Sequence, residues 1–356
     1  MDAVATHVLA VVSSACRLCR SVYDADEDFA PARKGDGSPV TVCDFAIQAH
    51  VTGELRRRGL ALPLVAEEDL KDASPQDLAV VRKLVEKFAD HAFPREALPT
   101  PAAATAATRA LRRRHPSPGD PPFSTGAPSS SPFFILDPID GTRAFLRGDA
   151  SQFAIGLALI DGEDGTPVVG ALGLPNWRRA GVDLSQGSDL VLMAVRGGGA
   201  WAFSEGGGAP QRLRVARGTS LEDATVVLSE SQAWRTEGSD VLALACGYGP
   251  TRQPKDTLHV CCGSLVKYAC VAMGHAEAFV EHPVVGKERL NAWDHAAGVV
   301  LVQEAGGRVT DVEGRPLAFL PPPEAHITPR HGVVVASNGA MHDELAYAMR
   351  AGVELL

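Results

Sequence analysis

The chain has 356 residues, of which 45% are hydrophobic and 22% are charged, and its formal net charge is −9. This composition is typical of a globular protein of about two domains and argues against general disorder. The excess of acids disfavours nucleic-acid binding, which needs a basic surface, and no apolar run approaches the ~20 residues of a membrane span. We therefore expect a soluble, intracellular protein, cytoplasmic or organellar, with no nucleic-acid or membrane partner. Its oligomeric state stays open.

The N-terminus and the cysteines agree with this compartment. The first residues include an acid, Asp2, and no basic region, so a signal peptide is not expected. The seven cysteines are odd in number and irregular in spacing, which favours reduced thiols. Cys16 and Cys19 form a C-x-x-C pair inside an apolar-periodic stretch. We expect buried thiols on a helix there rather than a redox loop.

The first 92 residues are expected to form three helices and one short strand. Apolar periodicity predicts helices over 4–23, 44–58 and 75–92, and a strand over 60–66. Ser74 and Pro75 supply an N-cap and a first helical residue for the third helix. Residues 94–132 are rich in Pro, Ala and Ser and contain three consecutive arginines, which predicts a flexible insertion with a solvated charge run.

Ordered structure is expected to resume with a buried strand over 133–137 and a strand-rich meander over 152–203. Beyond a Gly-rich break at 206–208 the pattern becomes mixed α/β. We therefore place a boundary near 205, between an N-terminal α+β domain (1–205) and a C-terminal α/β domain (206–356). The second domain is expected to contain strands near 224–228, 258–261, 277–281 and 332–336, and helices near 238–246, 264–274, 294–305 and 338–350.

The most informative segment for function runs from Asp137 to Thr142 and reads DPIDGT. Pro138 fixes the turn after the strand, so that Asp137 and Asp140 can point to the same side. Gly141 permits a close approach of the backbone to a ligand, and Thr142 begins a helix whose first N–H groups can bind phosphate oxygens. Hard oxygen ligands beside a phosphate cradle suit Mg²⁺. An ordinary Asp-rich turn at a strand exit is the alternative interpretation.

Three further groups of acids lie at the ends of predicted elements. The run Glu67–Asp69 follows an apolar strand, Asp294 opens a Gly/Ala-rich helix, and Asp44 opens another helix. Acids that converge without basic partners would repel one another, and bound cations would remove that cost. The alternative is structural: a solvated acidic turn for the first group, and helix N-caps for Asp44 and Asp294. Capping and metal binding do not exclude each other.

Several segments in this order match a known family. Together they resemble the lithium-sensitive, inositol monophosphatase-like phosphatases, and within these they look most like the 3′(2′),5′-bisphosphate nucleotidases, including the plant-type members. The resemblance covers nearly the whole chain except 94–132. It implies an α/β (α+β) fold, a layered α/β/α/β/α sandwich with the site between its two halves. The matching segments are PVTVCD (Pro39–Asp44), AEED (Ala66–Asp69), DPIDGTRAFLRG (Asp137–Gly148), CCGSLVKY (Cys261–Tyr268), WDHAAG (Trp293–Gly298) and EAGGRVTD (Glu304–Asp311).

The resemblance also implies roles for individual residues. It implies two Mg²⁺ ions and leaves a weaker third ion open. Asp44 and Thr142 would orient and deprotonate the attacking water, and Glu68 and Asp69 would be outer-shell residues or assist the third ion. One ion would be held by Glu67, Asp137 and the Ile139 carbonyl, and the second by Asp137, Asp140 and Asp294. The expected substrate contacts are Gly141, Thr142, Ser264, Lys267 and Trp234, the last as a flat face for a base.

The implied activity is hydrolysis of a phosphate monoester, with adenosine 3′,5′-bisphosphate converted to AMP and phosphate, and the sulfated relative of that nucleotide as a second substrate. A small phosphorylated nucleotide is then the expected partner. The alternatives are an inositol phosphate or polyphosphate phosphatase of the same fold, and a weakly catalytic regulator that binds the bisphosphate. The intact set of acids argues against the regulator. Departures from the family pattern concern nucleotide contacts more than metal ligands: Cys43, Ala144, Trp234, and Glu281-His282 where an arginine is expected.

Overall fold

The computed structural model describes most of the chain on either side of the predicted insertion. The insertion at 94–132 lies almost entirely outside the described residues, as do the Gly-rich break at 206–208, Trp234 and the helix predicted near 238–246. The described residues are 3–24, 32–33, 39–69, 73–88, 131–148, 151–177, 190–204, 209–218, 220–229, 256–260, 262–281, 289–322 and 324–353.

Three helices form the N-terminal part of the fold: α1 (Ala3–Asp24), α2 (Val42–Arg57) and α3 (Pro75–Phe88). They confirm the three helices predicted in this region. The start of α3 is a capping box, in which Asp77 N donates to Ser74 Oγ at 3.1 Å and Ser74 N donates to Asp77 Oδ2 at 2.8 Å. Because two backbone N–H groups are satisfied in this way, the helix begins where the sequence predicts.

A seven-stranded sheet follows, with the strand order β3-β4-β5-β6-β7-β8-β9. β3 is parallel to β4 and every later pair is antiparallel, which confirms the predicted meander. β3 is shorter than predicted, because Pro63 has no N–H for a strand ladder and pairing begins at Leu64. The strands are β3 (Leu64–Ala66), β4 (Phe133–Asp140), β5 (Ala154–Ile160), β6 (Pro167–Leu174), β7 (Leu190–Val195), β8 (Gly199–Ser204) and β9 (Gln211–Arg212).

A second sheet has five strands in the order β11-β10-β12-β16-β14. β10 is parallel to β11 and β12, whereas β16 is antiparallel to β12 and β14. Since β9 still pairs with β8, the first sheet continues to residue 212, and the boundary near 205 stays a prediction. Four of these strands confirm those predicted in this half, whereas β14 was not predicted. The strands are β10 (Thr225–Ser229), β11 (Asp256–Val260), β12 (Ala278–Glu281), β14 (Arg308–Thr310) and β16 (Val334–Ser337).

Three helices accompany the second sheet: α8 (Leu265–Ala272), α9 (Ala296–Glu304) and α10 (His342–Val353). They confirm the helices predicted near 264–274, 294–305 and 338–350. α10 begins four residues later than predicted, because Gly339 has a φ of +88° and the chain turns before entering the helix. The remaining described elements are short. They are α5 (Thr142–Arg147), the β1–β2 pair (Ala32–Arg33 with Pro39–Val40), the β13–β15 pair (Leu290–Asn291 with His326–Ile327) and two 3₁₀ helices, η4 (Leu221–Asp223) and η5 (Arg330–Gly332).

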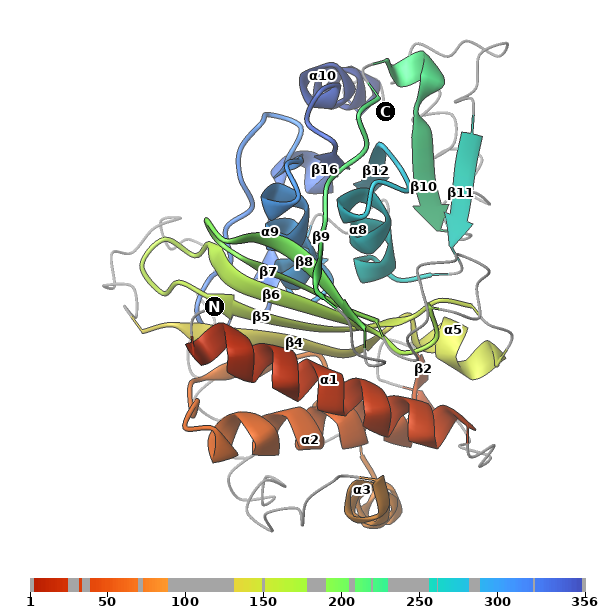
Figure 1. Cartoon of the computed structure of the whole chain (residues 1–356), viewed down its shortest axis with the longest axis vertical. Coiled ribbons are helices and arrows are strands. Elements are labelled where there is room, and N and C mark those ends of the chain that lie inside the picture. Colours follow the sequence, from red (N-terminus) through yellow and green to blue (C-terminus); the bar gives the residue numbers. More distant parts are fainter. Residues whose placement is uncertain are drawn as a thin grey trace, which may run out of the picture.

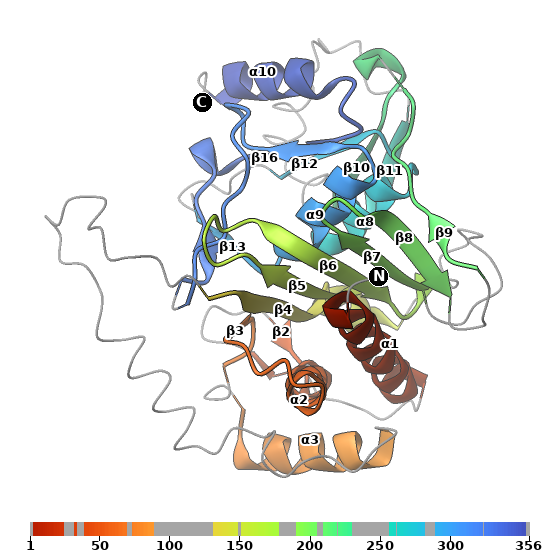
Figure 2. The same cartoon turned by 60° about the vertical axis from the view of Figure 1, so that its left-hand side comes forward.

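These elements stack in five layers (Figure 1). α1 and α2 cover one face of the seven-stranded sheet, α8 and α9 lie between the two sheets, and α10 covers the outer face of the second sheet. Figure 2 shows the same order from another direction. Three clusters of buried apolar side chains fill the spaces between layers. α8 and α9 can approach closely because residue 298 is glycine, since a Cβ there would overlap the Tyr268 ring. The expected α/β/α/β/α sandwich is confirmed.

α1 is the one described helix that is long and apolar enough to cross a membrane by length and composition. In this fold it packs closely on the first sheet. The close approach requires glycine at position 173 of β6, since a Cβ there would overlap the Cys16 sulfur. Cys16 and Cys19 are both fully buried, which confirms the expectation of buried thiols on a helix. A hydrogen bond with the Cys43 thiol, together with burial, raises the pKa of Cys19 well above its usual range. The neutral thiol is therefore favoured there.

Candidate active site

The end of β4 carries two buried carboxylates. β4 is buried along its whole length, and Asp137 and Asp140 are only 1% and 5% exposed. Pairing with β5 is regular up to Asp137 and then shifts register before Asp140. An irregularity of this kind changes the direction in which side chains leave a strand. It allows the two carboxylates to face the same side, as the sequence predicted.

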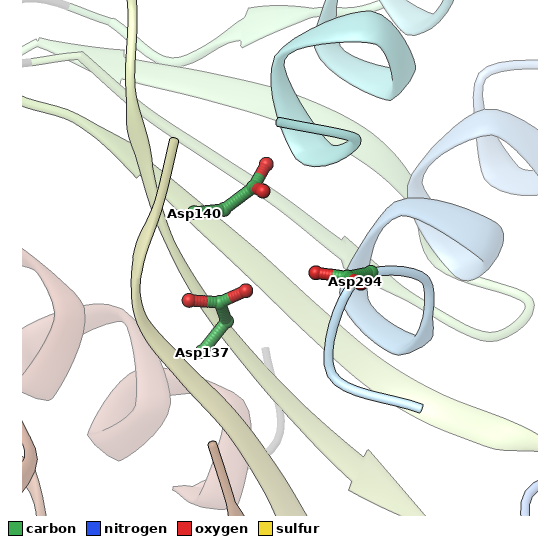
Figure 3. A group of neighbouring side chains, drawn as sticks. All are labelled: Asp137, Asp140 and Asp294. Atoms are coloured by element: carbon green, nitrogen blue, oxygen red, sulfur yellow. The ribbon is translucent and has the colours of Figure 1, made fainter. Parts of the chain in front are cut away.

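Asp294 joins these two carboxylates from the other half of the chain. One carboxylate oxygen from each of Asp137, Asp140 and Asp294 can be chosen so that all three lie within 4.8 Å of one another. Figure 3 shows the three side chains pointing toward a common space, two from the end of β4 and one from the turn before α9. The fold therefore brings together three of the predicted metal ligands from the two halves of the sequence.

The surroundings of Asp137 point to a bound cation. Both of its carboxylate oxygens are buried, and no group among the described residues donates a hydrogen bond to them. The neighbouring Glu67 is another carboxylate, which can bond to Asp137 only when one of the two carries a proton. Burial raises the pKa of Asp137 well above its usual range, and the nearby carboxylates, Glu67 first among them, raise it further. An ionised carboxylate buried in this way is costly unless a cation compensates it.

Asp140 is held by backbone N–H groups at the start of α8. Ser264 N donates to Asp140 Oδ1 at 3.1 Å, and Leu265 N donates to Asp140 Oδ2 at 2.6 Å. Burial outweighs these two bonds and raises the pKa of Asp140 to about 6. Residue 263 is glycine with a φ of +83°, and a Cβ there would lie 2.7 Å from Asp140 Oδ2. Asp140 thus faces the carboxylate cluster and also fastens α8 to the end of β4.

Asp294 lies in the turn before α9, and the N-cap of that helix is His295. The alternative that Asp294 is an N-cap is therefore wrong, and its side chain is oriented toward the cluster. Asn291 Nδ2 donates to Asp294 Oδ2 at 3.1 Å. Burial raises the pKa of Asp294 well above its usual range, and the charge of Asp140 raises it further. A 2.9 Å hydrogen bond between His295 Nδ1 and Tyr268 OH of α8 fixes the turn.

Asp44 and Thr142 meet although 98 residues separate them in sequence. The Thr142 hydroxyl lies 3.3 Å from Asp44 Oδ1 and 3.2 Å from the carbonyl oxygen of Ile139. Asp44 Oδ2 accepts from Thr41 N at 2.8 Å and from Thr41 Oγ1 at 2.5 Å, which completes a capping box at the start of α2. The N-cap is Thr41, so the alternative of an Asp44 N-cap is wrong. Asp44 is the third helical residue, and the box fixes its side chain.

The acidic turn after β3 contains three different environments, since Glu67 is half-buried, Glu68 is buried and Asp69 is exposed. Glu67 N donates to the Leu136 carbonyl at 3.2 Å, which extends the pairing of β3 with β4. Gln48 of α2 holds the backbone of Glu68 by two hydrogen bonds of 2.9 and 3.2 Å. A solvated turn therefore describes Asp69 but not Glu68. The outer-shell roles of Glu68 and Asp69 stay predictions.

The predicted substrate contacts lie on both sides of the cluster. Gly141 has a φ of +91° and precedes α5, a conformation that favours glycine. The Ser264 side chain makes no capping hydrogen bond at the start of α8. Lys267 is 2% exposed and donates from Nζ to Glu281 Oε2 at 2.5 Å. Lys267 is therefore one half of an ion pair rather than an isolated point charge. Trp234 lies outside the described residues.

Three residues that position this site were not among the predicted site residues. Thr41 has a sequence signal, because Thr-x-x-Asp before a helix forms a capping box. Gly263 and Glu281 have no local signal, since each acts on a residue that is distant in sequence or on another element. They become visible only when α8, β4 and β12 are in place.

The donor set fits a hard divalent cation. The converging group offers carboxylate oxygens, with no cysteine or histidine among the described residues that compose it. Mg²⁺ prefers such oxygen ligands, whereas Zn²⁺ favours sulfur and nitrogen. Since the described residues offer no hydrogen-bond donor to the Asp137 oxygens, a cation would also compensate this buried carboxylate.

Comparison with known proteins gives consistent matches along the chain. A family model described as the inositol monophosphatase family matches residues 1–354. A mitochondrial protein of Arabidopsis thaliana, provisionally named a 3′(2′),5′-bisphosphate nucleotidase, is 33% identical over 359 residues, covering 94% of this chain and 83% of the relative. The 3′,5′-bisphosphate nucleotidase AHL of Arabidopsis thaliana is 32% identical over 351 residues, covering 90% of this chain and 88% of the relative.

The solved structure of the inositol monophosphatase of Thermotoga maritima has a TM-score of 0.59 with this chain at 21% identity. The likeness covers 98% of this chain and 97% of that structure. At this identity it concerns the fold alone. It agrees with the five observed layers and confirms the inositol monophosphatase-like sandwich that the sequence motifs implied.

Proposed function

The chain belongs to the inositol monophosphatase family, and from that premise we propose that it is a Mg²⁺-dependent phosphatase that hydrolyses adenosine 3′,5′-bisphosphate to AMP and phosphate. The sulfated relative of that nucleotide is the proposed second substrate. The relatives of 33% and 32% identity, both named as bisphosphate nucleotidases, support this choice. The observation that carries the proposal is Asp137, a buried carboxylate that receives no hydrogen bond from the part of the chain that the structure describes and that lies beside Asp140 and Asp294.

The acids around Asp137 would hold two Mg²⁺ ions. Asp137 would contribute to both, with Glu68 and Asp69 outside them or assisting a weaker third ion. When bound, the ions would neutralise charge on the phosphate and on the leaving oxygen and would increase the acidity of the attacking water. The proposed ligands are Glu67, Asp137 and the Ile139 carbonyl for one ion, and Asp137, Asp140 and Asp294 for the other.

Asp44 and Thr142 would act on the attacking water. The Thr142 oxygen can accept a proton from the water while its own hydroxyl proton passes to Asp44 Oδ1, 3.3 Å away. A positioned general base of this kind contributes about 10²–10⁴ in rate. Because the capping box already fixes Asp44, little reorganisation is needed before proton transfer.

Groups from both halves would bind the rest of the substrate. The backbone at Gly141 and Thr142 would contact the scissile phosphate at the start of α5. Ser264 and Lys267, one helical turn apart, would contact the ribose and the second phosphate. Trp234 would stack on the adenine, an interaction worth ~1–3 kcal/mol for a base on an aromatic ring.

A second candidate is an inositol phosphate phosphatase on the same fold. The ion pair between Lys267 and Glu281 favours it, because a lysine that is already paired offers less charge to a second phosphate. A weakly catalytic regulator that binds the bisphosphate has no comparable support. The contact between Asp44 and Thr142 and the cluster around Asp137 are both present, and a regulator would need neither.

The test is phosphate release in Mg²⁺ from adenosine 3′,5′-bisphosphate and from inositol 1-phosphate. The proposal expects a kcat/KM at least about tenfold higher for the nucleotide, a difference of about 1.4 kcal/mol. Lys267→Ala should reduce that preference. Equal turnover of both substrates, or an equal effect of Lys267→Ala on both, would exclude the nucleotidase and leave the general phosphatase. No phosphate release from either substrate would contradict both candidates.

A further inference from the structure

Lys267 of α8 is a buried cation that forms an ion pair. Its side chain is 2% exposed, and Nζ lies 2.5 Å from Oε2 of Glu281, the last residue of β12. Nζ also lies 5.4 Å from the centroid of the Phe279 ring, within the range of a cation–π contact. A buried ammonium needs such neighbours because burial penalises its charge. Glu281, which is 22% exposed, therefore neutralises Lys267 at the edge of the protein interior.

The ion pair lies on the α8 side of the carboxylate cluster. The first turn of α8 is fastened to Asp140 through the N–H groups of residues 264 and 265, and Lys267 follows in the same turn. Burial dominates the pKa values of Asp140 and Asp294. As smaller effects, the charge of Lys267 lowers the pKa of Asp140 and the charge of Glu281 raises the pKa of Asp294. Both members of the pair thus lie within electrostatic reach of the proposed metal ligands.

The charges of the proposed ligands and of the ion pair can be offset within each group. Two divalent cations would offset the four carboxylates proposed as ligands, and Lys267 and Glu281 offset each other. A second phosphate group on the substrate would add about 1.5–2 negative charges. It could approach the Lys267 ammonium only by sharing it with the Glu281 carboxylate, which would repel it.

We propose that Glu281 is a specificity-determining residue: by holding the Lys267 ammonium in an ion pair, it weakens binding of substrates that carry a second phosphate relative to substrates that carry one. This inference rests on the proposed hydrolysis of phosphate esters at the carboxylate cluster, but not on the organic part of the substrate. Because Glu281 acts on a group away from the scissile phosphate, the difference that it makes between the two kinds of substrate falls on KM and not on kcat.

The experiment compares adenosine 3′,5′-bisphosphate with adenosine 3′-monophosphate, which lacks only the 5′-phosphate. Glu281→Gln keeps the shape of the side chain and an oxygen that accepts from Lys267, but removes the charge. The ratio of KM for the bisphosphate to KM for the monophosphate should fall about tenfold, and the ratio of the two kcat values should not change. Glu344→Gln is the matched control, because it removes the same charge from an exposed position on α10 and should leave both ratios unchanged.

The role of Lys267 is tested by repeating Glu281→Gln in a Lys267→Met background. The fall in the KM ratio should then disappear, because no ammonium is left to release. An equal fall with and without Lys267 would mean that any lost acid has this effect, and it would overturn the proposal. An unchanged or higher ratio in Glu281→Gln would overturn it as well. If thermal unfolding shows that Glu281→Gln is not folded, the same comparison is made with Glu281→Asp. Its shorter side chain reaches Lys267 less well, so the ratio of KM for the bisphosphate to KM for the monophosphate should fall about twofold to threefold.

Failure of the nucleotidase proposal is distinguishable from failure of this inference. If wild-type protein releases phosphate only from inositol phosphates, the nucleotidase is excluded, and the same KM ratio between an inositol bisphosphate and inositol 1-phosphate decides the role of Glu281. If nucleotides are hydrolysed but the ratio does not respond to Glu281→Gln, the role of Glu281 is excluded and the nucleotidase remains. Absence of phosphate release from all four substrates would overturn both.

Discussion

The two sides of the candidate site are built in different ways. On the side of α2 and β4, short sequence segments determine the geometry: a capping box fixes Asp44, and one strand end supplies Asp137 and Asp140. On the side of α8, α9 and β12, the geometry depends on contacts between distant segments, such as the hydrogen bonds from the N–H groups of residues 264 and 265 to Asp140. Under the proposed function, the first side would contact the phosphate that every monoester shares. The second side would add Asp294 to the metal ligands and would contact what differs between substrates. We therefore expect substrate choice to respond mainly to mutations at Lys267 and Glu281, and chemistry to mutations at the carboxylates and Thr142.

The largest expected effect is on the first side, at Asp137. Asp137→Asn removes a charge while keeping the size, and the new amide can donate to the neighbouring carboxylates, so the protein without metal should fold at least as stably. Turnover should fall about a thousandfold or more, and the rise in Tm caused by Mg²⁺ should vanish. Asp343→Asn, at an 85% exposed position on α10, is the control and should change neither quantity. Near-normal turnover in Asp137→Asn would contradict the metal assignment.

Asp44→Asn should have the next largest effect, with kcat reduced by about 10²–10⁴ because the proton acceptor is lost. Thr41→Ala separates this role from helix capping. It removes the Thr41 side chain from the box, at a cost of about 1 kcal/mol in the free energy of unfolding, but it keeps the contact between Asp44 and Thr142. Steady-state kinetics and urea unfolding of both variants decide between the two roles. A similar loss of kcat in Thr41→Ala would mean that Asp44 matters for the helix and not for chemistry.

Gly263→Ala tests how the second side supports the first. A Cβ at 263 would lie 2.7 Å from Asp140 Oδ2, at a φ that costs a residue with a Cβ roughly 1–2 kcal/mol. We expect a lower Tm and an approximately tenfold loss of turnover, equal for substrates with one or two phosphates. Gly314→Ala is the matched control, because Gly314 has a φ of +77° with nothing within 4 Å of an added Cβ. It should lose stability but keep turnover, and equal kinetics in the two variants would disprove the role of Gly263.

The smallest expected effect is a pH dependence of Mg²⁺ stabilisation. Without metal, the pKa of Asp140 is about 6, above the value near 3.9 expected in an unfolded chain. Between about pH 4 and 6 Asp140 is therefore more protonated in the folded chain than in the unfolded chain, and its contribution to the free energy of unfolding decreases as pH rises. Mg²⁺ competes with these protons. Its effect on Tm should be larger at about pH 7.5 than at about pH 5, and an equal shift at both would exclude these carboxylates as the binding site.

The same contrast explains what the sequence could predict. Asp137, Asp140 and Thr142 were identified because a strand, a turn and a helix start follow one another within six residues. The helices and most strands were predicted for the same reason, since their periodicity and caps are local. The pairing of Lys267 with Glu281 was not predicted, because Glu281 lies on another element and nothing near either residue records their contact. The hydrogen bonds from residues 264 and 265 to Asp140 span 124 and 125 positions and needed the tertiary fold to be seen.

The central claim is that the carboxylate cluster binds Mg²⁺ and that hydrolysis of a phosphate ester depends on it. The most direct measurement is phosphate release from adenosine 3′,5′-bisphosphate by metal-depleted protein titrated with Mg²⁺, with Tm followed in the same samples. The account predicts no release without metal, and activity and Tm that rise together and saturate over the same Mg²⁺ range. Phosphate release that persists in excess chelator, or activity that returns without any change in Tm, would contradict it.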